Sequence, residues 1–92
     1  MKVFKSIDER FSEIGLEKVK EDEYGADYER KTRFGYVQCI SLVRKASGFH
    51  IIQSYEKSLN TDGFNNCVDI TMYEAKLCRK KMKQMGWKEK KK

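Results

Sequence analysis

The sequence predicts an α+β fold with a short N-terminal helix, an antiparallel meander of three or four strands, and a C-terminal amphipathic helix packed on one sheet face. Two observations carry this prediction. Apolar residues recur with the helical period at both ends of the 92-residue chain, and with a period of two in between. The links between the predicted strands are too short for parallel crossovers. We expect one domain over residues 1–87, followed by a disordered basic tail at 88–92.

The C-terminal helix has the clearest sequence signals. Thr71 and Glu74 match a capping box, in which each side chain bonds to the other residue's amide. Gly86 is expected to end the helix in the left-handed conformation, with Trp87 folding back on the last turn. Tyr73 and Leu77 form a pair outside the main apolar stripe. That stripe is predicted to consist of Met72, Ala75, Cys78, Met82 and Met85.

The N-terminal helix has the same start and stop signals in a shorter segment. Ser6 and Glu9 fit a second capping box, and the helix is expected to begin at Lys2 or Ser6 and to end at Ile14. Gly15 follows, flanked by apolar residues as Gly86 is.

The middle of the chain reads as strands near 16–21, 24–29, 36–45 and 49–57. In the most apolar strand, 36–45, Val37 and Cys39 share one face while Ile40 and Leu42 share the other. The polar stretch 59–66 is expected to be a loop, and 67–70 an extended entry to the last helix. The helices should cover one sheet face and leave the other to solvent or a partner.

The net charge of +6 is concentrated at the C-terminal end. Between Lys76 and Lys92 there are nine Lys or Arg residues and one acidic residue, Glu89, which gives a net charge of +8. The other 75 residues carry a net charge of −2. A solvated helix face is one interpretation. The other is contact with phosphates of nucleic acid, without base-specific reading because Arg79 is the only arginine in the segment. The candidate nucleic-acid-binding residues are Lys76, Arg79, Lys80, Lys83 and Lys88.

One short motif partly matches a known nucleic-acid-binding pattern. Phe34-Gly35-Tyr36-Val37 matches the middle of the RNP1 pattern of RNA-recognition domains, whose aromatic residues stack on bases. Arg33 stands where that pattern has glycine, and Cys39 where it has an aromatic residue. A turn glycine followed by a core strand accounts for the run better.

The sequence offers little for catalysis, metals or membranes. Cys39, Cys67, Cys78 and His50 lack the short ligand spacing of zinc sites, and three unpaired cysteines indicate a reducing, cytoplasmic setting. There is one histidine, and neither a Gly-rich phosphate loop nor a nucleophile elbow. We therefore expect no enzyme activity, no cofactor and no metal. We also expect no membrane association, because no apolar run reaches about 20 residues.

A resemblance covers about the C-terminal half of the chain. The matching runs are His50-Ile51-Ile52-Gln53-Ser54-Tyr55, Asp62-Gly63-Phe64-Asn65-Asn66, Met72-Tyr73-Glu74 and Lys81-Met82-Lys83-Gln84-Met85-Gly86-Trp87. This half resembles small uncharacterised proteins encoded by phages and prophages of Gram-positive bacteria. The resemblance implies an intracellular accessory protein of a mobile element that acts by binding. It implies no activity, and no site residue can be carried over.

Two functions follow as expectations. The first is a non-catalytic, phage-type accessory protein whose basic C-terminal helix binds nucleic acid or a nucleoprotein complex without sequence specificity. The alternative is a protein-interaction module, either a homodimer or a binder of a phage or host protein. It would use the exposed sheet face, with Tyr24, Tyr28 and Tyr36 as aromatic anchors.

Overall fold

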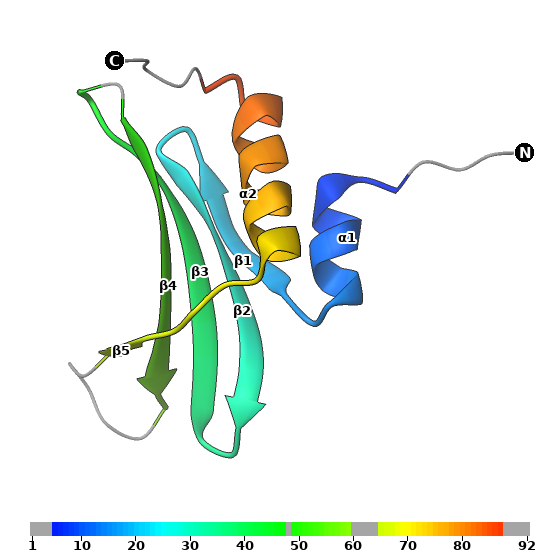
Figure 1. Ribbon diagram of the computed structural model, residues 1–92, viewed down its shortest axis with the longest axis vertical. Helices are drawn as coiled ribbons and strands as arrows, with labels where there is room; N and C mark the ends of the chain where they lie inside the picture. The colour runs from blue at the N-terminus through cyan, green and yellow to red at the C-terminus, as the bar shows by residue number, and fades with distance from the viewer. Residues whose placement is uncertain (1–4, 48, 60–64, 88–92) are drawn as a thin grey trace, which may run out of the picture.

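The computed structural model describes residues 5–47, 49–59 and 65–87 and confirms the predicted α+β class (Figure 1). Two helices lie on the same face of one sheet, and the strands follow one another in chain order. The elements in chain order are α1 (Ile7–Glu13), β1 (Glu17–Asp22), β2 (Gly25–Arg33), β3 (Tyr36–Arg44), β4 (His50–Ser58), β5 (Asn65–Cys67) and α2 (Met72–Gln84).

The sheet is an antiparallel meander, as the short links predict. It has five strands within the described residues, where the sequence predicted three or four. The additional strand, β5, pairs with Tyr55–Lys57 of β4 in a segment expected to be loop and extended chain. Backbone pairing over three residues at a sheet edge needs no apolar alternation, so the sequence pattern did not reveal it. Of the expected loop 59–66, residues 60–64 lie outside the described part.

The core lies between the helices and the sheet. Ile40 and Leu42 of β3 are buried there beneath the helices, whereas Val37 and Cys39 face the opposite side, as their alternation predicted. Neither described helix combines the length and apolarity that crossing a bilayer requires. The buried cluster consists of Phe11, Leu16, Ala26, Tyr28, Ile40, Leu42, Leu77, Cys78 and Trp87.

Both helices begin and end with the same local devices. The two predicted capping boxes are present, Ser6 with Glu9 and Thr71 with Glu74. At the C-terminus of α1, the Gly15 and Leu16 amides donate to the carbonyls of Ser12 and Phe11, at 2.9 Å each. These are the two bonds of a Schellman motif.

The end of α2 repeats this pattern. The Gly86 and Trp87 amides donate to the carbonyls of Lys83 and Met82, at 3.0 Å each. Gly86 has φ +82°. The motif folds Trp87 into the core, where its ring lies 5.1 Å from the imidazole of His50. The helix stop is therefore also a packing device.

The structure decides between the two predicted starts of the first helix and corrects the predicted apolar stripe of the last one. Helix α1 begins at Ile7 with Ser6 as its cap, so of the two expected starts the later one is correct. The apolar stripe expected on α2 is rotated: Met72 is 92% exposed, while Leu77, placed outside the stripe, is fully buried. Two charged residues that share this face, Glu74 and Lys81, are also buried.

The backbone conformation at Gly86 leads to a first prediction. We expect Gly86→Ala to destabilise the protein by about 1–2 kcal/mol, because an L side chain strains the left-handed region. A Cβ atom there would meet nothing within 4 Å, so the loss isolates the backbone term. Denaturant unfolding, monitored by Trp87 fluorescence, measures this loss of stability. Gly86→Asn should lose less stability than Gly86→Ala, because asparagine tolerates positive φ. Equal stability of the alanine variant and the parent would contradict this account.

Candidate nucleic-acid interface

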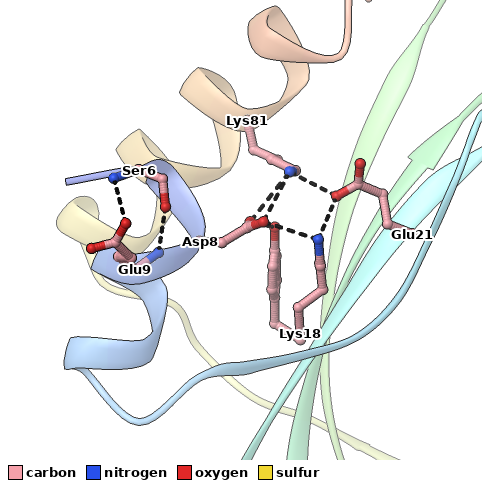
Figure 2. A network of polar contacts seen from close by, with 7 residues as sticks. Ser6, Asp8, Glu9, Lys18, Glu21 and Lys81 are labelled. Carbon is pink, nitrogen blue, oxygen red and sulfur yellow. Dashed lines mark hydrogen bonds and ion pairs between the residues drawn. The ribbon is translucent and has the colours of Figure 1, made fainter. Parts of the chain in front are cut away.

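The orientation of α2 is set by a cluster of alternating charges beneath it (Figure 2). The Lys81 ammonium lies 2.7 Å from a Glu21 carboxylate oxygen and 3.2 Å from an Asp8 oxygen. Lys18 reaches the same two carboxylates, at 3.0 Å from Asp8 and 3.2 Å from Glu21. The Lys81 side chain is only 5% exposed, so it is desolvated and depends on these partners. Two cations and two anions from α1, β1 and α2 form a neutral group.

A tyrosine from β2 completes this cluster. The Tyr28 hydroxyl donates to Asp8 at 2.5 Å, while its ring stacks on Phe11 with the centroids 4.1 Å apart. Burial alone would raise the pKa of Asp8, but hydrogen bonds from Tyr28, Lys18 and Lys81 outweigh it and hold that pKa below its usual range. The hydrogen bond from Lys81 likewise lowers the pKa of Glu21. Both carboxylates are therefore held ionised.

A second cluster, around Arg30 of β2, holds the start of α2 and the end of α1. The Arg30 guanidinium donates to the Ile14 carbonyl at 3.0 Å and to a Glu74 carboxylate oxygen at 2.9 Å. It also donates to the Gln38 side chain at 2.6 Å. The other carboxylate oxygen of Glu74 accepts from the Thr71 amide in the capping box. One arginine thus joins two helix ends to the sheet.

These clusters turn the basic side of α2 outward. Four of the five residues predicted to contact nucleic acid, Lys76, Arg79, Lys80 and Lys83, are exposed and lie on one helix face. Over residues 5–47, 49–59 and 65–87, the structure gives none of these four an ion-pair partner. Lys88, the fifth, lies outside the described residues. Their exposed charges can act on a ligand in solution.

The three tyrosines proposed as interface anchors do not share a surface. Tyr24 is 67% exposed in the β1–β2 turn. Tyr28 is fully buried under the helices, so its assignment as an anchor is wrong. Tyr36 is half-buried at the start of β3, on the sheet face that carries Ile40, with the Arg33 guanidinium 3.9 Å above its ring. The period-two pattern identified alternating faces but not which face the helices would cover.

Thiol chemistry finds little support in the geometry. Cys78 lies in the core beneath the helices, on the opposite side of the sheet from Cys39, so these residues do not converge. Burial raises the pKa of the Cys39 thiol, and burial raises the pKa of Cys78 to about 12. Both are protonated at neutral pH and unsuited to nucleophilic attack. Among the described residues no group of three or more His, Cys, Asp or Glu side chains could hold a metal ion.

Comparison with protein-family models, with curated protein sequences and with solved structures finds no match for this chain. The geometry of its own residues therefore carries the functional argument.

Sequence reasoning missed two sets of residues. Glu74 and Lys81 share the face of Leu77, but charged residues at those positions are normally interpreted as solvent-facing. Their seven-residue spacing was the available signal, together with the complementary charges in α1 and β1. The second is the pairing of Phe34, which the sequence marked only as part of the RNP1-like run, with Leu59; both line a hollow at the β2–β3 turn. The sequence gives no local sign that these two approach each other.

The Lys81 cluster yields a stability prediction with a neighbouring control. We expect Lys81→Ala to lower the free energy of unfolding by about 2 kcal/mol, because Asp8 and Glu21 each lose a charged hydrogen-bond donor. Lys80→Ala removes the same charge from the exposed side of the same turn and should stay within about 0.5 kcal/mol of the parent. Denaturant melts of the two variants provide the comparison. Similar losses in both would show that the buried cluster does not hold α2.

The lowered carboxylate pKa values also predict a pH dependence. The folded-state pKa values of Asp8 and Glu21 lie below their unfolded ones, so their contribution to stability is complete above about pH 5. It is lost as the pH falls below about 4, through the lowered values. Thermal melts between pH 7 and 3 should show Tm falling over that range. Asp8→Asn with Glu21→Gln should make the decline shallower, and an unchanged slope would contradict the assignment.

Proposed function

We propose that this protein is a non-catalytic, cytoplasmic accessory protein that binds nucleic acid, or a nucleoprotein complex, through the outward face of α2. The supporting observation is the set of four exposed cations without ion-pair partners in the described chain: Lys76, Arg79, Lys80 and Lys83. By contrast, Lys18, Arg30 and Lys57 each lie within 3.2 Å of a carboxylate. Lys31 also lacks an ion-pair partner among the described residues, but it lies on β2, apart from this helix face.

The spacing of these cations suits a phosphate backbone. Seven residues separate Lys76 from Lys83, about 10 Å along a helix. One strand of a duplex carries a phosphate every 3.4 Å or so of axis, so this span matches roughly three phosphates. The charges are displayed on a rigid helix anchored by buried ion pairs, which limits the entropy lost on binding.

The expected binding is independent of sequence. Three of the four cations are lysines, which act as compact point charges on phosphate. Arg79 alone could form the bidentate contacts that read base edges. A role in a phage-type system belongs to the same proposal, and its support is the resemblance of the C-terminal half to phage-encoded proteins.

The test is the salt dependence of binding to a mixed-sequence duplex. We expect measurable affinity at low salt that falls steeply as salt rises, because bound counterions are released. Replacing Lys76, Lys80 and Lys83 together by Gln should weaken binding. It should also reduce the slope of log K against log salt by about 0.9 for each phosphate that the variant no longer neutralises.

The matched control is Gln at Lys20, Arg44 and Lys45, three exposed cations outside α2 whose replacement changes the net charge equally. We expect this variant to keep nearly the parent slope. Equal losses in both variants would point to a diffuse charge effect rather than to α2. Absence of binding by the parent at low salt would refute the proposal, and a dimer mass without nucleic acid would favour the protein-interaction alternative.

A further inference from the structure

The sheet extends beyond the two helices at the β2–β3 turn, which lies at the bottom of Figure 1. A hollow of about 460 Å³ opens at this uncovered end. This volume falls within the range of small-molecule sites. Its principal lining residues are Lys31, Arg33, Phe34, Tyr36 and Leu59.

The lining combines apolar surface with planar groups. Phe34 is fully exposed at the turn, which is unusual for a large aromatic residue within a folded domain. Leu59 is kept beside it, because its amide donates to the Gly35 carbonyl at 2.8 Å. The rim therefore has a fixed backbone and an apolar surface open to solvent.

The guanidinium of Arg33 is held in place over one ring. It lies 3.9 Å from the Tyr36 ring centroid and donates to Glu56 at 3.2 Å. Glu56 also accepts from the Thr32 hydroxyl at 2.7 Å. The negative charge of Glu56 is thus engaged by its neighbours. The Arg33 side chain is still 60% exposed, so part of it remains open to a ligand.

We propose that this hairpin end is a stacking site for an unpaired base of single-stranded nucleic acid. Phe34 and the Arg33–Tyr36 pair offer the flat surfaces on which bases stack. Lys31 is exposed and has no ion-pair partner in the described chain, so it supplies a charge for the adjoining phosphate. The site rests on the proposed function and extends it, because a duplex keeps its bases stacked internally and cannot fill the hollow.

The charge of the site favours a nucleotide over a second protein. Two cationic side chains flank the exposed aromatic ring, and Glu56, the acidic group that Arg33 contacts, is already hydrogen-bonded. An anionic, planar ligand matches both properties. An apolar protein segment would match Phe34 and Leu59 only.

The experiment compares oligothymidylate with a duplex of the same length for the full chain and two variants. Phe34→Ala should weaken binding of the single strand roughly 5- to 100-fold, the loss expected for one stacked base. It should leave the duplex affinity and the salt slope unchanged, because the substitution removes no cationic group. Tyr24→Ala removes an exposed aromatic residue from the β1–β2 turn and should leave both affinities unchanged.

The outcomes separate this site from the α2 interface. If both nucleic acids bind through α2 but Phe34→Ala leaves the single-strand affinity unchanged, the stacking site is refuted and the proposed function stands. Equal losses from Phe34→Ala and Tyr24→Ala would also refute it. If the parent binds neither nucleic acid, both proposals fail. A dimer that forms without nucleic acid and is lost in Phe34→Ala would assign the hollow to protein contact instead.

Discussion

The ion pairs of Lys81 constrain the whole arrangement of this protein. An ammonium group that is almost withdrawn from water is tolerated only where carboxylates surround it, and Asp8 and Glu21 meet that need from α1 and β1. A helix turns by about 100° per residue. If α2 were rotated by one residue about its axis, either a lysine would be buried without a partner or the two carboxylates would lose theirs. The cluster therefore specifies which side of α2 faces water. Arg30 adds a second fixed point at the start of the helix.

This constraint separates two surfaces with different chemistry. The side of α2 that carries Lys76 and Lys83 is hydrophilic, cationic and rigidly mounted. The β2–β3 turn, at the end of the sheet that the helices leave uncovered, is aromatic and only modestly charged (Figure 1). Neither surface takes part in the core. Electrostatic attraction acts over about a Debye length, whereas stacking acts only at contact. The two surfaces would therefore act at different stages of an encounter with a polyanion.

Much of the architecture can be predicted from the sequence, because it depends on interactions between residues that are close in the chain. The capping boxes, the glycine stops and the alternation of Ile40 and Leu42 with Val37 and Cys39 depend on neighbouring residues, and these were predicted correctly. The errors have a common origin in long-range contacts. The seven-residue spacing of Glu74 and Lys81 marks a shared helix face, but it does not show that this face is buried, because the carboxylate partners of Lys81 are far away in the chain. Tyr28 was predicted on the open face because no local pattern shows which face the helices cover. The hollow beside Phe34 requires Leu59, which follows it by 25 residues.

The contact between Asp8 and Lys81, which lie 73 positions apart, has a bearing on how the chain acquires its structure. The β-hairpins join residues that are close in sequence, so little loop entropy opposes their formation. Pairing of α1 with α2 closes almost the entire chain and brings in Trp87, which belongs to the buried cluster. During synthesis the meander can form first, with Ile40 and Leu42 uncovered. The apolar face is covered only after α2 has also been synthesised and has folded onto it.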